Sequence, residues 1–255
     1  APRGWDQPRL DEGIPGLVVH LSAQAFQNLR SVPGTDLRGS GLLVGAGLPL
    51  EWLVRRAQEQ GLSGVEFLAG VPGRVGGAVR MNAGTHDDEG RLHSMSNVVR
   101  SITVMDRQGR VQTLTRQEIP FRYRFSGLDG QIVLEAFLGL SPDDKDEIAA
   151  RVQRLWAFKK RTQDWSAPSV GCIFKNPTDR SAGRLMDQAG MKGFRIGGAV
   201  VSPRHANFIL NDGNARAADV LALIEEAKAR VYKQFGVKLE TEVQILPVHD
   251  EPVES

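Results

Sequence analysis

The sequence predicts an α+β fold in two domains, residues 11–140 and 141–248. Three observations support this prediction. Segments of strand-like alternation and segments of helical period both occur, without an internal repeat. A chain of 255 residues is long enough for two ordinary domains, each with its own core. Residues 141–144, which directly follow a predicted strand, also have the pattern of a helix start.

The first domain is predicted to contain one helix among several strands. Residues 16–22 and 131–140 have strand-like patterns, and residues 98–115 predict a hairpin that turns around 106–109. Residues 49–61 have the pattern of a helix with Pro49 in its first turn and Gly61 at its end. The apolar face of this helix is predicted to contain Leu50, Leu53, Val54 and Ala57.

The second domain is predicted to begin with a helix. Ser141 is its expected N-cap and Pro142 its first residue. Acidic residues lie near the start and basic residues near the end, as the helix dipole favours. The basic residues are Lys159, Lys160 and Arg161, and the face expected to be buried contains Ile148, Val152 and Leu155.

Two more helices and a strand are predicted after it. Residues 181–190 have the pattern of a short capped helix and residues 217–236 that of a longer one. The apolar side of the longer helix is predicted to contain Val220, Leu221, Ile224, Val231 and Phe235. Residues 237–245 alternate strictly, which predicts a strand with Glu240 and Glu242 together on its polar face.

Charge and composition exclude several classes of protein. The net charge of +2 is spread over the chain without a block of one sign, so we expect no nucleic-acid partner and no membrane anchor. No apolar run approaches the roughly 18 residues of a membrane-spanning helix. The single cysteine excludes a disulfide framework, and the five scattered histidines show no spacing typical of a zinc site. We expect a cytoplasmic monomer without a metal.

Glycines are concentrated in residues 69–84, which read AGVPGRVGGAVRMNAG. Glycine loses more conformational freedom on folding than other residues, so such a cluster indicates positive φ angles or close backbone approach. The spacing matches neither a Rossmann fingerprint nor a P-loop. Two interpretations remain open at this point: a tight connection between strands, or a backbone cradle for a pyrophosphate.

Five segments, read in chain order, resemble the UDP-N-acetylenolpyruvoylglucosamine reductase family. They are LSGVEFLAGVPGRVGGAVRMNAG (62–84), RYRFSGL (122–128), SVGCIFKNP (169–177), SAGRLMDQAGMKGFRIGGAVVSPRHANFILN (181–211) and LETEVQIL (239–246). The resemblance runs from about Asp11 to Leu246 and is closest to the shorter of the two family subtypes. It implies a vanillyl-alcohol-oxidase-type FAD-binding domain, followed by a smaller α+β substrate-binding domain.

The resemblance also implies a reaction and its cofactors. The family uses NADPH and FAD to reduce an enolpyruvyl ether of a nucleotide sugar in peptidoglycan synthesis. The residues that match the family's FAD-packing positions all lie in the glycine segment, where small side chains let the backbone approach the cofactor. They are Val75, Gly76, Gly77, Asn82, Ala83 and Gly84.

Three residues match the family's catalytic positions. Arg124 follows a tyrosine as in the family, and its fixed charge suits a carboxylate, although a solvated surface arginine is the alternative. Glu242 matches the C-terminal glutamate, although the strand pattern alone does not separate it from Glu240. Cys172 lies where we expect most members to carry a serine proton donor. An ordinary thiol, with a pKa of about 8.5, is protonated at pH 7, and the alternative is a buried structural cysteine.

Six further residues match positions expected to contact the nucleotide sugar or NADPH. They are Tyr123, Lys175, Asn176, Arg184, His205 and Asn207.

The resemblance is incomplete at the start of the chain. Family members begin with a subdomain whose Gly-Gly-Gly-Ser-Asn loop binds the FAD pyrophosphate, and the 255 residues do not contain that loop. We therefore expect a FAD-binding domain that is incomplete at its N-terminus. Two alternatives to the reductase are another FAD-dependent oxidoreductase of the same superfamily, such as a sugar or alcohol oxidase, and a non-catalytic fragment that binds a nucleotide sugar.

Overall fold

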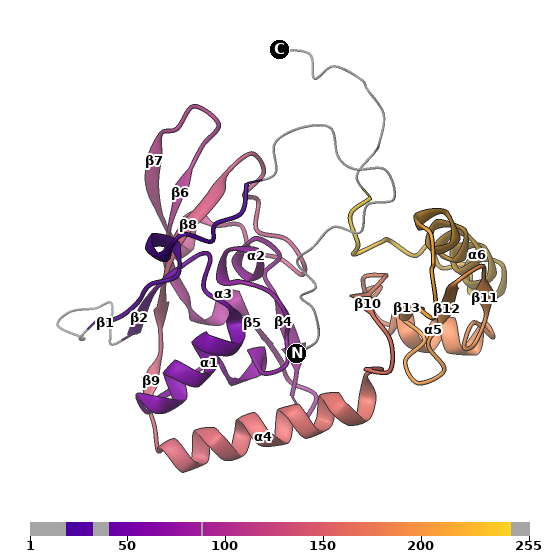
Figure 1. Cartoon of the computed structure of the whole chain (residues 1–255), viewed down its shortest axis with the longest axis horizontal. Coiled ribbons are helices and arrows are strands. Elements are labelled where there is room, and N and C mark those ends of the chain that lie inside the picture. The colour runs from indigo at the N-terminus through magenta and orange to yellow at the C-terminus, as the bar shows by residue number, and fades with distance from the viewer. Residues whose placement is uncertain (1–18, 33–40, 88, 246–255) are drawn as a thin grey trace. The chain divides into compact units, whose positions relative to one another are not determined.

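A computed structural model describes residues 19–32, 41–87 and 89–245 (Figure 1). These residues form two compact units, 19–159 and 160–245, and each unit has its own hydrophobic core. The units divide between Lys159 and Lys160, whereas the predicted domain boundary lies at 140 and 141. That boundary stays a prediction, and its outer ends, 11–18 and 246–248, lie outside the described residues.

The first unit is built on an antiparallel five-stranded sheet. Its strands, in spatial order, are β1 (Leu29–Val32), β2 (Gly41–Gly45), β8 (Ile132–Gly139), β6 (Val99–Met105) and β7 (Val111–Thr115). The predicted hairpin at 98–115 is confirmed, because β6 and β7 pair from Ser101–Thr115 to Met105–Val111. The predicted strand at 131–140 is confirmed as β8. Residues 19–22 are not a strand, so the prediction for 16–22 is wrong in its described part.

The predicted helix at 49–61 is confirmed as α1 (Leu50–Glu59). Pro49 is its N-cap, and Gly61 follows it in the left-handed conformation, with φ 67°. Its buried residues are the four that the apolar spacing predicts: Leu50, Leu53, Val54 and Ala57. Local pattern and tertiary packing agree here because this helix buries only one face.

Short elements connect the sheet to the rest of the first unit. They are η1 (Gln24–Phe26), β3 (Leu62–Ser63), η2 (Glu66–Leu68), α2 (Val75–Arg80), β4 (Gly84–His86), β5 (Leu92–Ser94), α3 (Met95–Val98), η3 (Arg116–Glu118) and β9 (Ser141–Pro142). β4 and β5 form a hairpin, and β3 pairs with β9.

The pairing of β9 corrects the predicted start of the next helix. Ser141 and Pro142 extend the chain against β3 instead of capping a helix. The helix is α4 (Lys145–Thr162), and the Asp144 side chain accepts hydrogen bonds from the N–H groups of Asp146 and Glu147. Local preference assigns Ser141 and Pro142 to the start of the helix, but these residues pair with β3, which lies far away in the sequence.

The second unit contains a four-stranded antiparallel sheet with two helices. The strands, in spatial order, are β10 (Ser169–Cys172), β13 (Phe208–Asn211), β12 (Ala199–Val201) and β11 (Arg195–Ile196), and the helices are α5 (Ala182–Gln188) and α6 (Ala217–Phe235). Both helices confirm their predictions. Ser181 caps α5 by accepting from the Arg184 N–H, and Gly236 ends α6 in the left-handed conformation.

Two predictions for the second unit are wrong. Leu221 is 37% exposed, because the core of this unit contacts Leu223 and Ala227 on a face rotated from the predicted one. Residues 237–245 form no strand and make only a single β-bridge, between Thr241 and Phe174. After that bridge the alternation fails, and Ile245 is 54% exposed.

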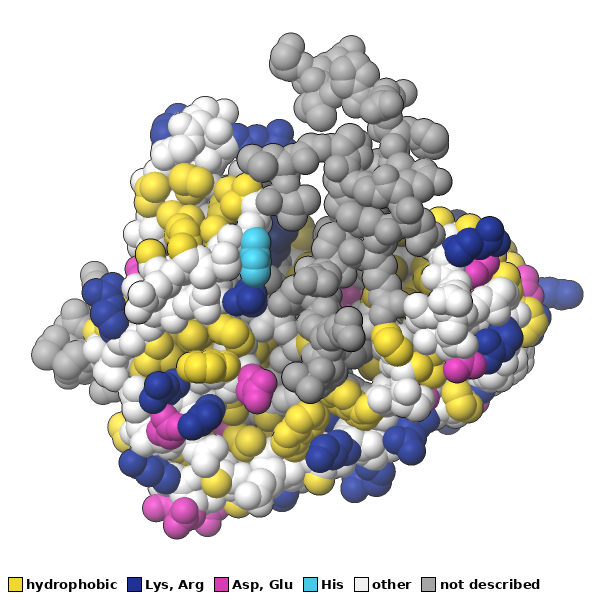
Figure 2. All heavy atoms as spheres, viewed as in Figure 1, with side chains coloured by type: hydrophobic (Ala, Val, Ile, Leu, Met, Phe, Trp, Pro, Cys, Tyr) yellow, Lys and Arg dark blue, Asp and Glu magenta, His cyan; other side chains and the backbone are white. Residues whose placement is uncertain are grey.

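Charged side chains of both signs lie on the surface of both units (Figure 2). On the face drawn in Figure 2, acidic and basic side chains are interspersed with hydrophobic ones over both units. Within the described residues, no helix combines the length and the apolar character that crossing a membrane requires. The same residues contain no group of three or more His, Cys, Asp or Glu side chains arranged to hold a metal ion.

Candidate active site

The glycine segment of the first unit is hydrogen-bonded to the residues that follow β2. The N–H groups of Val75 and Gly76 donate to the carbonyl oxygens of Leu48 (3.0 Å) and Ala46 (2.8 Å). An added Cβ at Gly76 would lie 2.9 Å from the Ala46 Cβ, so this glycine permits close backbone packing. Gly84 has the same constraint, because its added Cβ would collide with the His93 carbonyl oxygen. These two glycines are required by the fold itself.

Gly77 differs from its neighbours. An added Cβ there would meet no other part of the described chain within 4 Å, so internal packing does not explain the glycine. In a helix interior glycine also costs about 0.5–1 kcal/mol relative to alanine. Its backbone therefore lies beside open space, as expected where another molecule approaches closely.

Two residues of α4 hold the start of the glycine segment. Gly70 adopts φ 69°, and an added Cβ would lie 2.7 Å from the Trp156 ring. The Lys159 ammonium donates to the carbonyl oxygens of Phe67 (3.2 Å) and Ala69. Lys159 is only 3% exposed, and burial lowers its pKa to about 8. Lys159 and Trp156 are called the α4 clamp below.

Asn82 joins the glycine segment to two neighbouring loops. It is buried, and its backbone is left-handed with φ 42°. The side-chain Nδ2 donates to the Arg122 carbonyl oxygen (2.9 Å), and Oδ1 accepts from the Ser96 N–H (2.9 Å). Ala83 follows with its N–H on the Ala78 carbonyl oxygen. The Asn82 amide thus fixes the segment, and only its backbone remains to face a cofactor.

Arg124 lies at the tip of a tight turn closed by Arg122 and Phe125. These two residues exchange backbone hydrogen bonds of 2.9 and 3.1 Å, which leaves Tyr123 and Arg124 at the turn. Arg124 has φ 54°, and its Nη1 donates to the Gly84 carbonyl oxygen (3.0 Å). Its guanidinium also lies 5.2 Å from the centre of the Tyr123 ring. The structure therefore brings Arg124 and Tyr123 to the end of the glycine segment.

In the second unit, Cys172 and Glu242 lie on adjoining stretches of chain. Cys172 ends β10 and is half-buried, with Gly171 in the left-handed conformation before it. The Glu242 N–H donates to the carbonyl oxygen of Ile173 (2.7 Å), the residue after Cys172. Predicted residues that are far apart in the sequence are thereby close in the fold.

Glu242 and Glu240 have different environments, which corrects their predicted placement on one polar face. Glu240 is 74% exposed in its side chain and forms an ion pair with Lys175, whose N–H also donates to the Glu240 carbonyl oxygen (2.9 Å). Glu242 is half-buried beside the β10 end. The loss of strand geometry after Thr241 separates the two carboxylates that the alternation predicts together.

Two predicted substrate contacts hold the loop after Cys172. Asn207 is 2% exposed, and its amide both donates to the Phe174 carbonyl oxygen (2.8 Å) and accepts from the Phe174 N–H (2.9 Å). The Asn176 Oδ1 accepts from the Ala182 N–H (2.9 Å) at the start of α5. These contacts position the loop and the helix that follows it.

His205 is also held in place by contacts with other residues of the second unit. Its N–H donates to the Ser202 hydroxyl (3.0 Å), and its Nδ1 accepts from the Asn207 N–H (3.3 Å). The ring lies 4.6 Å from the Phe208 ring, and burial lowers the pKa of the imidazole. His205 is therefore neutral at pH 7 and accepts a backbone hydrogen bond.

Comparisons with known proteins identify the family. The family model "UDP-N-acetylenolpyruvoylglucosamine reductase, C-terminal domain" matches residues 163–246, and the model "FAD binding domain" matches residues 9–115. A UDP-N-acetylenolpyruvoylglucosamine reductase from Halalkalibacterium halodurans is 40% identical over 239 residues, which cover 92% of this chain and 75% of that protein. The chain belongs to the UDP-N-acetylenolpyruvoylglucosamine reductase family.

Other relatives of this family agree. The UDP-N-acetylenolpyruvoylglucosamine reductase of Bacillus subtilis is 39% identical over 96% of this chain and 78% of its own length. The crystal structure of the Thermus caldophilus UDP-N-acetylenolpyruvylglucosamine reductase matches with a TM-score of 0.72 and 40% identity, over 88% of this chain and 76% of that one. The expected family and fold class, a FAD-binding domain followed by a reductase C-terminal domain, are confirmed.

Within this reductase family fold, the glycine segment fits FAD. The open space beside Gly77 is the observation that decides the fit, since nothing in the described chain occupies it. Val75, Gly76 and Gly77 together with the backbone of Asn82, Ala83 and Gly84 are the residues that could hold the cofactor. The predicted residues thus form two sets: the glycine segment with Tyr123 and Arg124 in the first unit, and the others in the second unit.

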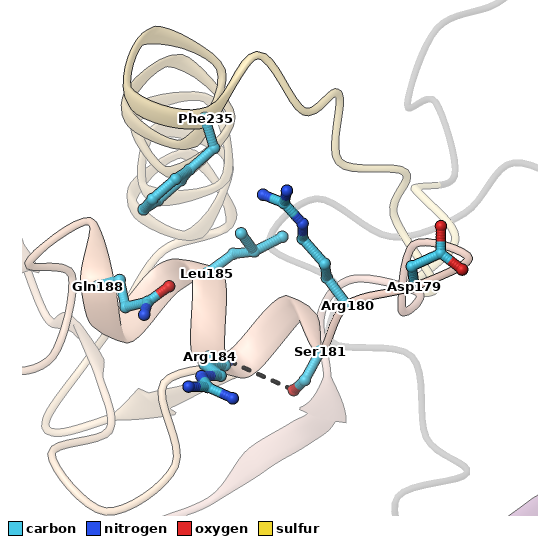
Figure 3. A pocket seen from close by; sticks show the side chains of 7 residues that line it. All are labelled: Asp179, Arg180, Ser181, Arg184, Leu185, Gln188 and Phe235. Atoms are coloured by element: carbon cyan, nitrogen blue, oxygen red, sulfur yellow. Dashed lines mark hydrogen bonds between the residues drawn. The ribbon is translucent and has the colours of Figure 1, made fainter.

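Sequence reasoning missed two features of these units. The α4 clamp has a weak signal, because Lys159 continues the spacing of Ile148, Val152 and Leu155 on the buried face of the helix. The second feature is a pocket of about 320 Å³ between α5 and the end of α6, and Arg184 is the one predicted site residue among those that line it (Figure 3). Arg180 and Phe235 carry no motif that marks them as pocket residues.

Proposed function

We infer that the chain catalyses the NADPH-dependent, FAD-mediated reduction of UDP-N-acetylenolpyruvoylglucosamine to UDP-N-acetylmuramate in peptidoglycan synthesis. The observation that carries this inference is about 40% identity to reductases of this name over more than nine-tenths of the chain. The match of residues 163–246 to the reductase's own C-terminal domain disfavours another FAD-dependent oxidoreductase of the superfamily and a non-catalytic fragment.

The chemistry is addition of a hydride and a proton across an enol ether. When bound, FAD supplies the hydride that it has received from NADPH. Addition at the outer vinyl carbon places negative charge on the inner carbon, next to the substrate carboxylate. The chain must therefore stabilise that charge and supply one proton to the inner carbon.

Arg124 is proposed to bind the carboxylate and stabilise the developing charge. A guanidinium is always charged and can donate two parallel hydrogen bonds to a carboxylate. Its bond to the Gly84 carbonyl oxygen holds the side chain at the edge of the FAD-binding segment, and the left-handed backbone at the turn fixes its direction. Tyr123 packs against the guanidinium and lies beside the same substrate group.

Cys172 is proposed to donate the proton, and Glu242 to steady the enolic intermediate. The thiol transfers its proton to the inner carbon and is left as a thiolate, which regains a proton from solvent before the next turnover. The Glu242 N–H is bonded to the carbonyl oxygen of Ile173, the residue after Cys172. The Glu242 carboxyl group can therefore stabilise the enolic intermediate while Cys172 transfers its proton. Half-burial of both residues limits access of water to the intermediate.

Five residues are proposed to bind the nucleotide sugar or to shape its site. Lys175 supplies a cation that can leave Glu240 for a substrate phosphate. Asn176 and Asn207 act by holding the loop after Cys172, and neutral His205 supports Asn207. Arg184 contributes its charge from α5. We further propose a cytoplasmic monomer with no nucleic-acid or membrane partner.

Rapid mixing of the two half-reactions tests this assignment. The full chain is loaded with FAD, reduced with NADPH, and then mixed with the enolpyruvyl substrate while flavin absorbance is followed. We expect Arg124→Lys to slow flavin reoxidation by about 10²- to 10³-fold, because lysine cannot form the two parallel bonds. Reduction by NADPH should change little.

Arg122→Lys is the matched control, since Arg122 is two positions away and its guanidinium lies over the Phe125 ring. It should leave both half-reactions within a few-fold of the parent. Equal slowing of the two half-reactions by Arg124→Lys would contradict the assigned role. No flavin reoxidation by this substrate in the parent chain would contradict the proposed function itself.

A further inference from the structure

The turn that presents Arg124 has a backbone conformation that arginine does not favour. Arg122 and Phe125 close this four-residue turn, and Arg124 occupies its third position with φ 54°. A positive φ at this position normally selects glycine or asparagine, because a Cβ comes too close to the neighbouring carbonyl oxygen. A conformation of this kind persists only where the surrounding structure holds it. The direction of the Arg124 guanidinium therefore depends on the contacts on either side of the turn.

The glycine segment holds this turn from both sides. Before the turn, the Asn82 amide donates to the Arg122 carbonyl oxygen (2.9 Å). After it, the Ser126 hydroxyl donates to the Arg80 carbonyl oxygen (2.6 Å). Ser126 is only 2% exposed, so water does not compete for this bond. Arg80 is the last residue of α2 and Asn82 follows closely, so both contacts come from one short stretch of chain.

The Arg80 side chain holds the stretch after the turn a second time. Its Nη1 donates to the Leu128 carbonyl oxygen, and its Nη2 donates to the Asp129 carboxylate (2.7 Å). Leu128 is 3% exposed and belongs to the core of the first unit. The chain beyond Ser126 is therefore fixed both by core packing and by the end of α2.

We propose that Ser126 is a positioning residue for Arg124 in the reduction. This inference rests on the proposed function, in which the Arg124 guanidinium binds the substrate carboxylate. While the Ser126 hydroxyl is bonded to Arg80, the turn keeps its left-handed backbone and the guanidinium stays on the Gly84 carbonyl oxygen (3.0 Å). Ser126 is buried, so it acts through the turn and not on the substrate.

This role predicts a loss that is confined to one chemical group of the ligand. Ser126 sets the direction of a guanidinium, and that guanidinium is proposed to contact only the carboxylate end of the substrate. Without the Ser126 hydroxyl, the turn can relax toward a negative φ at Arg124, and the paired hydrogen bonds to the carboxylate lose their alignment. Binding of the nucleotide and of the sugar should be unaffected.

Ligand binding to the full chain, supplied with oxidised FAD and without NADPH, tests this role, because the substrate then stays intact. The probes are UDP-N-acetylenolpyruvoylglucosamine and UDP-N-acetylglucosamine, which lacks the enolpyruvyl carboxylate, and calorimetry gives their dissociation constants. The variants are Ser126→Ala, Arg124→Ala and the two combined. Ser31→Ala is the matched control, since the Ser31 hydroxyl also donates a hydrogen bond of 2.6 Å within the first unit, but to Gln60.

We expect Ser126→Ala to raise the dissociation constant of the enolpyruvyl probe about tenfold when Arg124 is present. In the Arg124→Ala background the same change should raise it by no more than about twofold, because a residue that acts through another has no effect once that other is gone. The dissociation constant of UDP-N-acetylglucosamine should stay within about twofold of the parent in every variant. Ser31→Ala should match the parent with both probes.

Equal losses in the two backgrounds would overturn the proposal, because Ser126 would then act independently of Arg124. Equal losses with the two probes, or an unchanged enolpyruvyl dissociation constant in Ser126→Ala, would also overturn it. Arg80→Met repeats the test if Ser126→Ala does not fold, since it keeps Ser126 and removes only the side-chain contacts with Leu128 and Asp129. It should weaken the enolpyruvyl probe about threefold, and only where Arg124 is present.

Failure of this inference is distinct from failure of the proposed function. A parent chain that binds the enolpyruvyl probe while the losses in Ser126→Ala and Arg124→Ala simply add contradicts the positioning role alone. A parent chain that binds neither probe contradicts the proposed function, and the positioning role with it.

Discussion

The two sets of candidate site residues, one in each unit, are built from different groups. In the first unit, the glycine segment presents backbone: Gly76 and Gly84 are packed against neighbouring chain, Gly77 faces open space, and the Asn82 side chain is used internally. In the second unit, the proposed chemistry depends on side chains, chiefly those of Cys172 and Glu242, which are both half-buried. Substitutions in the glycine segment should therefore act through the space that a side chain occupies, and those at Cys172 and Glu242 through charge and protons.

The largest expected effect is on the rate of flavin reoxidation, and it should differ between two neighbouring carboxylates of the second unit, Glu242 and Glu240. We expect Glu242→Gln to slow reoxidation of reduced flavin by substrate about 10³-fold, because the amide cannot carry the charge or proton of a carboxyl group. Glu240→Gln should change this rate only a few-fold, since Glu240 is exposed and joined to Lys175 by a surface ion pair. Rapid-mixing absorbance measures both. If the two variants slowed flavin reoxidation equally, the half-buried Glu242 would have no role that the exposed Glu240 lacks.

The next effect concerns Cys172. Cys172→Ala removes the proposed proton source and should slow the same step by about 10²- to 10³-fold. Cys172→Ser should retain much of the activity, because a hydroxyl can donate a proton from the same place. Steady-state turnover of the FAD-loaded chain, with thermal unfolding as the stability control, compares the two. If alanine were as active as cysteine, Cys172 would be only a packing residue.

The third effect concerns the stability of the first unit, where Lys159 of the α4 clamp holds the glycine segment. Because burial lowers the pKa of Lys159 to about 8, the folded chain binds fewer protons than the unfolded chain between that pH and the ordinary lysine pKa of 10.5. The free energy of unfolding should therefore rise with pH across this window, by about 3 kcal/mol from Lys159. Lys159→Met should lose this rise, as measured by urea unfolding from about pH 7 to 10.5.

Lys160→Met is the control for the clamp, since Lys160 is adjacent but exposed. It should keep the pH dependence of the parent. A parallel pH dependence in the parent and in Lys159→Met would show that the buried ammonium does not titrate in this window.

The smallest effects compare two adjacent glycines. Gly76→Ala should lower the free energy of unfolding by about 1–3 kcal/mol, because the new methyl group would overlap Ala46. Gly77→Ala should leave the apoprotein as stable or about 0.5–1 kcal/mol more stable, because alanine favours the helix. Its effect should instead be weaker FAD binding, measured by flavin fluorescence. Unchanged FAD affinity in Gly77→Ala would mean that the cofactor does not approach this backbone.

Much of the fold was predictable where a segment needs only its own pattern. α1 has the predicted buried residues, and Ser181 and Gly236 cap their helices as expected. The errors lie where a distant segment intervenes. Ser141 pairs with β3 instead of capping α4, and residues 237–245 make a single bridge instead of a strand. Such pairings depend on contacts between residues far apart in the chain, to which local preference is insensitive.

For the site, the sequence by itself determined the family, and it supplied the glycine segment and the residue types that are proposed for the cofactor-binding and catalytic positions, because these depend on motif and spacing. Only the tertiary structure decided which of those residues are available. It assigns the amides of Asn82 and Asn207 to internal hydrogen bonds, separates Glu242 from Glu240, and leaves Gly77 beside open space. The physical reason is that burial and hydrogen-bond partners come from segments far apart in the chain, and a motif records neither.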